Sequence, residues 1–513
     1  MRQALRPNRS RRPVARFASL PAPVAGLNFR DAIAALGPTD ALILDNYFPH
    51  ASYVELRRGY TEHVTGFASP VESVFDYAAP NGTAKLFAAA GTAIYDATTA
   101  GAVGAAVVSS LTNARWQTVQ FSTLGGDFLV AVNGADGVRT YNGSAWATQT
   151  ITGATAANLV TVASHKTRLW FGENASTKAW YLGTGAIAGA ATALDLGYVW
   201  SLGGNLAFIV PISFQNTQGL DDVLCFVSTE GEVAAYVGTD PASANTWQLG
   251  GVYRIGRPTN RRAVARFGGD AIVMTDGGVV SLRQIVAVDL SQAGNVSITD
   301  KINRVLGEQV AAAASTFGWE MIIYPAGTRL IVNAPQEDGT YRQWVMNTLT
   351  GAWCRTIGME ALSWSLMAGA PYFGGATAVY QADTGATDNA GNIVGEVKGA
   401  FSVLGVPALK RMTMFRPTLT ANGNPAPAVG IDVDFSDVTP TDVLVSSVSG
   451  GQWDVSLWDA AVFGSTTNNL REWTTVANIG LTVAPRLRTE TRGFDIQITG
   501  FDLAFEAQGL AAL

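Results

Sequence analysis

Cysteine and histidine are scarce in this sequence of 513 residues. Cys225 and Cys354 are the only cysteines, and His50, His63 and His165 are the only histidines. Two cysteines exclude a disulfide framework and a zinc site built mainly on thiolates, and both are expected to be buried and reduced. No histidine has a serine, a cysteine or a second histidine at a spacing typical of proton transfer or metal binding. The sequence therefore predicts no catalytic residue, no cofactor and no metal ligand, and we expect a protein that is not an enzyme.

Short enzyme motifs are also missing. The chain has no phosphate-binding loop, no zinc-protease helix and no Gly-x-Ser-x-Gly elbow. Paired carboxylates could still hydrolyse glycosides without histidine. Residues 239–247 are the segment most similar to the aspartate box of sialidases, but they lack its glycine and occur once. Carbohydrate binding or glycoside cleavage by a β-propeller, for example one that binds a host-surface receptor, therefore remains an alternative to a protein without enzymatic activity.

Charge is the third scarcity. Charged residues make up 14% of the chain, with 34 Lys and Arg against 40 Asp and Glu and a net charge of −6. An average chain is roughly one quarter charged. Much of this surface is therefore expected either to be buried in an assembly or to consist of strands rich in threonine, asparagine and glycine.

The few positive charges are unevenly placed, because residues 1–16 hold six arginines and no acid. The rest of the chain has 28 basic and 40 acidic residues, a net charge of −12. So acidic a body argues against wrapping of nucleic acid, which needs a basic face. This basic N-terminal arm has three interpretations: a disordered tail, an arm that docks on an acidic neighbouring subunit, and a contact with DNA phosphates. Its arginines are Arg2, Arg6, Arg9, Arg11, Arg12 and Arg16.

Long hydrophobic runs and helical patterns are rare as well. No segment is apolar enough over its length to predict a membrane span, so no stable membrane insertion is expected. Helical periodicity occurs at residues 31–36 and at residues 301–314, where Thr299 and Asp300 are candidate N-caps. The remainder is predicted to be strand and turn, and residues 215–222 are one candidate for a long polar loop.

Between residues 70 and 390 a loose pattern recurs, in which an apolar strand, a turn with Gly or Asp, and a strand bearing an aromatic residue follow one another. Repeats of roughly 40 to 50 residues built from hairpins are typical of β-propeller blades. One blade cannot bury both of its faces, so blades stack around an axis and aromatic side chains fill the space between them. Two ordinary β-sandwiches would produce similar hairpins and remain an alternative.

After residue 395 the strands lengthen and alternate strictly between apolar and polar residues, as in residues 410–416 and 429–435. We therefore predict a mainly β protein with few short helices, in which a β-propeller-like central domain is followed by an antiparallel β-sandwich-like C-terminal domain. The predicted divisions are a basic arm (1–16), an extended lead-in with a short helix (17–69), the propeller-like domain (70–395) and the C-terminal domain (396–513).

Both ends of the chain resemble one protein family. The N-terminal segments are Pro21-Ala-Pro-Val-Ala-Gly-Leu-Asn-Phe-Arg-Asp31, Pro38-Thr-Asp-Ala-Leu-Ile-Leu-Asp-Asn-Tyr-Phe-Pro49 and Val54-Glu-Leu-Arg-Arg-Gly-Tyr60, and the C-terminal ones are residues 399–415 with Pro417, 430–434, 453–459 and 503–506. Together they resemble the tail nozzle or tail tubular B-like proteins of short-tailed bacteriophages, also called packaged-DNA stabilisation proteins. The family also carries a propeller-like middle, and some relatives are considerably longer, so attachments that depend on their inserted domains are in doubt here.

The resemblance implies a virion structural protein without enzymatic activity. Its expected place is a homohexameric ring in the phage tail, made in the host cytoplasm, next to the tail adaptor protein and to tail fibres or spikes. DNA would pass through the ring without sequence-specific binding, and the protein would help to retain packaged DNA before ejection. An acidic lining would fit this role because it repels phosphates.

On this hypothesis the arm and the lead-in contact neighbouring subunits or the adaptor. The candidate contact residues are Arg2, Arg6, Arg9, Arg11, Arg12, Arg16, Arg30, Arg57 and Arg58.

Overall fold

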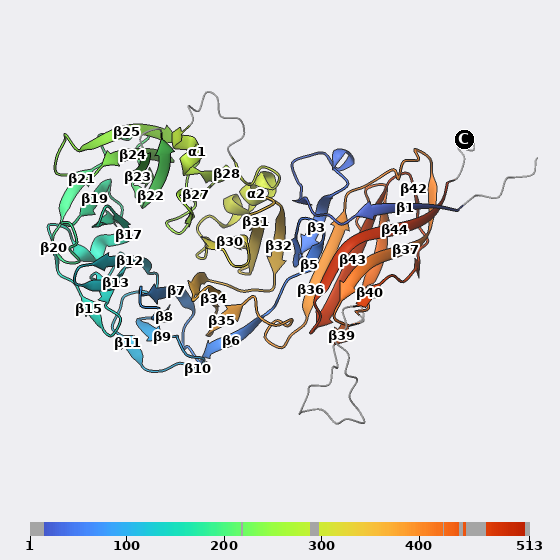
Figure 1. Ribbon diagram of the computed structural model, residues 1–513, viewed down its shortest axis with the longest axis horizontal. Coiled ribbons are helices and arrows are strands. Elements are labelled where there is room, and N and C mark those ends of the chain that lie inside the picture. Colours follow the sequence, from blue (N-terminus) through green and yellow to red (C-terminus); the bar gives the residue numbers. More distant parts are fainter. Residues whose placement is uncertain are drawn as a thin grey trace, which may run out of the picture. The chain divides into compact units, whose positions relative to one another are not determined.

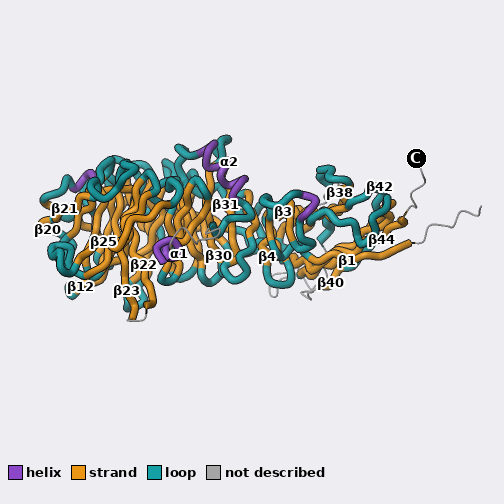
Figure 2. Tube along the Cα trace, turned by 90° about the horizontal axis from the view of Figure 1, so that it is seen from above, coloured by secondary structure: helices purple, strands orange, loops and turns teal. Residues whose placement is uncertain are grey.

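The computed structural model describes residues 15–216, 219–287, 297–423, 425–440, 445–447 and 468–507. The chain divides into two compact units: unit 1 comprises residues 1–57, 352–354 and 390–513, and unit 2 comprises residues 58–351 and 355–389. Strands dominate both units, and helices are few and short in the described part (Figure 2). The prediction of a mainly β protein with few helices is confirmed. The helices are η1 (Ile33–Ala35), η2 (Ala156–Asn158), α1 (Leu282–Ala287) and α2 (Asn303–Ala313).

Seven sheets follow one another around a common centre in the described part of unit 2, and we call them blades 1 to 7 (Figure 1). Blade 1 holds β6 (Tyr60–Thr65), β10 (Gly101–Ala102), β33 (Ser363–Met367), β34 (Ala370–Gly374) and β35 (Ala378–Ala382); blade 2 holds β7 (Val71–Ala78), β8 (Ala84–Ala90), β9 (Ala93–Asp96) and β11 (Ala106–Val108); blade 3 holds β12 (Gln117–Thr123), β13 (Gly126–Val132), β14 (Arg139–Tyr141) and β15 (Trp146–Thr148); blade 4 holds β17 (Leu159–His165), β18 (Arg168–Glu173), β19 (Lys178–Tyr181) and β21 (Thr192–Asp195). Blade 5 holds β22 (Leu206–Asn216), β23 (Gly219–Ser228), β24 (Glu232–Gly238) and β25 (Trp247–Arg254), and blade 6 holds β26 (Val264–Phe267), β27 (Asp270–Thr275) and β28 (Gly278–Ser281). Blade 7 holds β29 (Glu320–Tyr324), β30 (Arg329–Pro335), β31 (Tyr341–Asn347) and β32 (Trp353–Ile357). The residues of β32 are divided between the two units. The short strands β16 (Ile151–Thr152) and β20 (Gly189–Ala190) pair with each other outside these sheets.

The circle of blades is closed by strands from the two ends of unit 2. In blade 1, β6 pairs antiparallel with β35, which brings Tyr60 opposite Ala382 although more than three hundred residues separate them. Neighbouring blades contact each other mainly through their inner strands: β33 of blade 1 contacts β7 of blade 2, and β22 of blade 5 contacts β27 of blade 6. The sheets of unit 2 thus form one closed succession, which differs from the alternative of two separate sandwiches.

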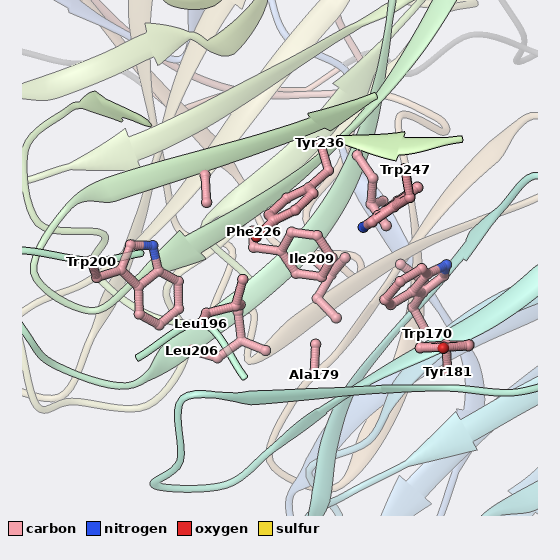
Figure 3. Close-up of a cluster of buried hydrophobic side chains, with 13 residues drawn as sticks. Trp170, Ala179, Tyr181, Leu196, Trp200, Leu206, Ile209, Phe226, Tyr236 and Trp247 are labelled. Atoms are coloured by element: carbon pink, nitrogen blue, oxygen red, sulfur yellow. The ribbon is translucent and has the colours of Figure 1, made fainter. Parts of the chain in front are cut away.

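Large aromatic side chains fill the space between neighbouring blades. Between blades 4 and 5, Trp247 stacks on Trp170 at 5.4 Å and on Tyr236 at 5.5 Å between ring centroids (Figure 3). Phe226 meets the edge of Trp170 at 5.4 Å in the same cluster (Figure 3). Aromatic rings bury much apolar area and prefer offset or edge contacts. They therefore hold together two neighbouring sheets, each of which would leave one apolar face exposed on its own. The recurrent aromatics of the sequence thus occupy the place that the repeat pattern predicts.

The helices depart from the sequence prediction in three respects. Residues 31–36 form only the single turn of η1, with no buried residue. The predicted helix at 301–314 is α2, but its N-cap is Ile302, whose apolar side chain cannot accept a capping bond. The candidate cap Thr299 instead accepts a hydrogen bond from the Val279 amide of β28. The sequence prediction missed α1, which follows directly after β28.

Two sheets make up the described part of unit 1. The first joins β1 (Ala15–Pro21), β4 (Tyr47–Pro49), β5 (Val54–Leu56), β37 (Lys410–Ala421), β40 (Asn468–Leu470), β41 (Thr474–Thr475), β42 (Ile479–Gly480) and β44 (Ile496–Ala507). The second includes β2 (Gly26–Leu27), β3 (Asp40–Asp45), β36 (Ile393–Gly399), β38 (Ala428–Val433), β39 (Val445–Ser447) and β43 (Val483–Arg492).

Unit 1 is therefore built from both ends of the chain. β1 and β5 pair with β44, and β3 pairs with β36. The predicted lead-in, residues 17–69, is not a separate extended segment: its strands β1 to β5 belong to unit 1, and β6 belongs to blade 1. The sequence gives no hint of this division because the pairing partners lie hundreds of residues away.

Candidate functional site

The first strand of each blade, counted from the centre, faces a central cavity of about 430 Å³ in unit 2. These inner strands are β7, β12, β17, β22, β26, β29 and β33, and residues of all seven line the cavity. Cavities of roughly 300–1,000 Å³ are the usual size for small-molecule sites. The central cavity is therefore the first candidate site.

Two carboxyl groups lie in the central cavity, Asp76 on β7 and Glu320 on β29. Burial raises the pKa of both above its ordinary value. The Ser365 hydroxyl donates to Asp76 Oδ1 at 3.3 Å, and the Trp364 amide donates to Glu320 Oε2 at 2.8 Å. These hydrogen bonds and, for Glu320, the positive charge of Arg262 oppose the effect of burial.

Arg262, in the loop before β26, crosses the centre of unit 2. Its Nη1 donates to the Glu72 carbonyl at 2.9 Å, and its Nη2 donates to Ser73 Oγ at 2.5 Å and to the Trp116 carbonyl at 3.0 Å. One guanidinium of blade 6 thus ties down β7 of blade 2 and the loop that enters blade 3. Burial lowers its pKa, but arginine remains charged in proteins, so the centre of unit 2 holds a fixed positive charge.

A second cavity of about 550 Å³ lies at the end of the ring where the loops enter the inner strands, and we call it the mouth cavity. It shares Gln117, Arg261 and Arg262 with the central cavity. Its polar lining is Arg115, Gln117, Asn174, Asn205, Thr229, Thr259, Asn260, Arg261 and Arg262, so three arginines and no carboxylate line it among the described residues.

Two of these three arginines have acidic neighbours and are held against one aromatic ring. Arg115 lies over the Phe317 ring at 4.4 Å and pairs with Glu72 at 3.0 Å. Arg262 lies over the same ring at 5.2 Å and is attracted by Glu320. Cation–π contacts of this kind fix the direction of a guanidinium. Both side chains are therefore positioned by the protein itself.

Arg261 differs from its two neighbours. It is exposed at the mouth, and its Nη2 donates to Asn174 Oδ1, a neutral acceptor, at 2.7 Å. Partial burial and the adjacent charge of Arg262 lower its pKa, and no carboxylate among the described residues forms an ion pair with it. The mouth cavity thus carries one positive charge without a local counter-ion.

The arginines predicted from the sequence lie elsewhere and do not come together. Arg16 and Arg58 are exposed, and Arg30 is exposed and pairs with Asp31 at 2.8 Å. Arg57 is buried and donates from Nε to Asn46 Oδ1 at 2.8 Å, so its guanidinium serves the interior of unit 1 rather than the surface. The remaining five, Arg2, Arg6, Arg9, Arg11 and Arg12, lie outside the described residues.

Other sequence predictions are mixed. Cys225 and Cys354 are buried free thiols, as predicted. Residues 215, 216 and 219–222, part of the predicted polar loop, instead belong to β22 and β23, which pair Asn216 with Gly219, and residues 217 and 218 lie outside the described residues. His165 is buried beside Trp247 instead of lying at the surface or in a turn, and burial lowers its pKa to about 4.

Within the described residues, no group of three or more His, Cys, Asp or Glu is arranged to hold a metal ion, and no helix is long and apolar enough to cross a membrane.

Comparison with known proteins gives only distant similarities. No family model and no curated protein matches the chain. Among solved structures, BBS1N in its complex with ARL6DN is 9% identical in a lead-soaked crystal, with a TM-score of 0.38 over 65% of this chain and 99% of that chain. The mercury-soaked crystal gives 11% identity and a TM-score of 0.39 over 64% of this chain and 97% of that chain. Raptor of Chaetomium thermophilum is 10% identical, with a TM-score of 0.38 over 64% of this chain and 29% of that chain. The similarity is to β-propeller proteins and concerns the fold class only.

Proposed function

We propose that this chain is a structural protein of the phage virion that forms the ring-shaped tail nozzle of a short-tailed phage, helps to retain packaged DNA and conducts the DNA during ejection. The observation that supports this best is the composition of unit 1. The N-terminal and C-terminal segments that resemble nozzle proteins, far apart in the sequence, supply paired strands of one unit, as when β3 pairs with β36. In the proposal unit 2 is a β-propeller, and unit 1 is an antiparallel β-sandwich that makes the ring contacts.

The edge of β1 supports a contact between copies of the chain. Among the described strands β1 pairs with β44, and none of its seven residues is buried. Phe17 is 72% exposed at its centre, next to the exposed Arg16. An exposed strand edge with an apolar residue offers backbone groups for pairing with another chain. We therefore assign β1 to a subunit interface, with a second copy of this chain as its partner in a hexameric ring.

The adaptor protein, fibres or spikes and the passing DNA belong to the same proposal. The acidic character of the chain, −6 in total, suits a channel wall on which DNA phosphates do not stick. The basic arm then serves as a tether to a neighbouring subunit or to the adaptor.

Electron microscopy of the purified protein tests the proposal. We expect sixfold rings, and Phe17→Ser should reduce the fraction of rings, whereas Leu124→Ser, which changes a fully exposed residue of unit 2, should not. Deleting residues 1–16 should weaken assembly; unchanged assembly would remove the tether interpretation. A protein that stays monomeric at every concentration and has no place on a virion would overturn the proposal.

One observation favours a second candidate, a carbohydrate-binding or glycoside-cleaving propeller. The central cavity holds Asp76 and Glu320, two carboxyls with raised pKa values, and glycosidases use such pairs. If this candidate is right, the protein hydrolyses a host-surface glycan, and Asp76→Asn abolishes the reaction while Asp96→Asn, outside the cavity, leaves it intact. Absence of hydrolysis across a glycan panel removes the cleaving form of this candidate.

A further inference from the structure

The mouth cavity has the features of a ligand site that the proposed function does not use. It is large enough for a sugar ring or a molecule of similar size, and it is lined by side chains of blades 3 to 7 and their loops. Because the inner strands all start at this end, residues distant in the sequence, such as Arg115 and Arg261, meet there. The question is which ligand chemistry the lining selects.

Charge is the first selector. The lining has three arginines, of which Arg115 is paired with Glu72 and Arg262 is attracted by Glu320. Arg261 is left with a neutral partner, Asn174. Arg262 is also engaged by three hydrogen bonds to the protein, so Arg261 is the arginine of the lining whose charge the protein engages least. A single such cation matches one carboxylate better than a polyphosphate, since a polyphosphate requires several uncompensated cations.

Geometry is the second selector. A guanidinium is a planar fork that binds a carboxylate through two parallel hydrogen bonds. Arg261 uses Nη2 for Asn174, and this bond steadies the fork at the mouth. Its neighbour in sequence, Asn260, is fixed by donation to the Trp319 carbonyl at 2.7 Å, so the loop that carries Arg261 is anchored.

The neutral lining is the third selector. Asn174, Asn205, Thr229 and Thr259 surround the charged end with amides and hydroxyls, which donate and accept hydrogen bonds as sugar hydroxyls require.

From these observations we infer that the mouth cavity binds an acidic saccharide, with its carboxylate on Arg261 and its hydroxyls on the surrounding amides and hydroxyls. This inference deepens the second candidate, carbohydrate binding by unit 2, and is independent of the nozzle proposal, because it concerns a small ligand and not the assembly of the ring. A ring that assembles without binding the saccharide, or a saccharide that binds a monomer, would separate the two.

Saturation-transfer NMR on the full chain tests the inference with sodium glucuronate, glucose and inorganic phosphate as probes. Glucuronate should bind at least tenfold more tightly than glucose. Arg261→Gln should weaken glucuronate binding at least tenfold, since it removes a charge-assisted bond. The matched control is Arg257→Gln, which changes a nearby exposed arginine whose partner is Glu230 at 2.8 Å, and should leave the affinity within twofold.

Three results would overturn the inference. Equal binding of glucose would remove the role of the carboxylate, and tighter binding of phosphate would point to a phosphate site instead. Unchanged glucuronate affinity in Arg261→Gln would remove the assigned residue. Thermal unfolding of Arg261→Gln should match that of the parent chain, because the exposed side chain makes one hydrogen bond to a neutral partner, so any loss of binding reports the site and not the fold.

Discussion

Replacing Arg262 with methionine should destabilise unit 2 strongly. The change removes three hydrogen bonds, to the Glu72 carbonyl, to Ser73 Oγ and to the Trp116 carbonyl. It also removes the positive charge that opposes the rise in the pKa of Glu320. At roughly 1–1.5 kcal/mol for each lost hydrogen bond, the change should cost about 3–5 kcal/mol. For a unit of this size we expect a fall in melting temperature of roughly 4–7 °C at pH 7.5.

The loss of stability in Arg262→Met should be larger at high pH than at low pH. Burial already raises the pKa of Glu320, and loss of Arg262 raises it further. A carboxyl whose pKa is higher in the folded state than in the unfolded state loses stability as the pH rises between the two values. The difference between Arg262→Met and the parent chain should therefore shrink as the pH falls from 8 toward 5.

Differential scanning calorimetry across this pH range measures the effect. The control is the double variant Arg262→Met, Glu320→Gln, whose difference from the single variant Glu320→Gln should be nearly independent of pH. A deficit of less than about 1 kcal/mol, or one that does not change with pH, would refute the assignment of Arg262 as the central tie.

Three further predictions concern the core and the buried charges. Burial and the charge of Lys166 lower the pKa of His165 to about 4. The free energy of unfolding should therefore fall by about 3 kcal/mol as the pH drops from about 6.5 to 4. Urea unfolding of His165→Gln should show that most of this pH dependence is gone. Trp247→Ala should cost about 3–5 kcal/mol by emptying the aromatic stack between blades 4 and 5, whereas Tyr198→Ala, 93% exposed, should be nearly neutral in the same assay. Lys398→Met should destabilise unit 1 by about 3 kcal/mol because it removes a buried cation 2.6 Å from Asp432, and adding Asp432→Asn should recover part of the loss; no recovery in the urea midpoint would contradict the pairing.

Local patterns in the sequence predict local structure well here. The alternation in residues 410–416 and 429–435 corresponds to β37 and β38, and the helical spacing of Leu306 and Val310 corresponds to the buried face of α2. These features depend on residues a few positions apart, where the periods of strand and helix apply directly. The recurrent aromatics, such as Trp170, also report their role because filling the space between sheets requires large apolar side chains.

Non-local features could not be predicted in the same way. The pairing of β6 with β35 and of β1 with β44 joins opposite ends of long segments, and no short pattern encodes it. The mouth cavity has the same origin, because Arg115 and Arg261 meet only once the blades close into a circle. The sequence feature that could have pointed to the mouth cavity is the pair Arg261-Arg262, two adjacent positive charges just before a strand in an otherwise acidic body.

The central claim is that copies of this chain form the ring of a phage tail nozzle, and cryo-electron microscopy of the purified full chain tests it most directly. The account predicts closed rings of six copies, with β1 of each copy at an interface and a continuous opening on the sixfold axis. A monomer, or an oligomer in which β1 faces solvent and no axial opening exists, would contradict it.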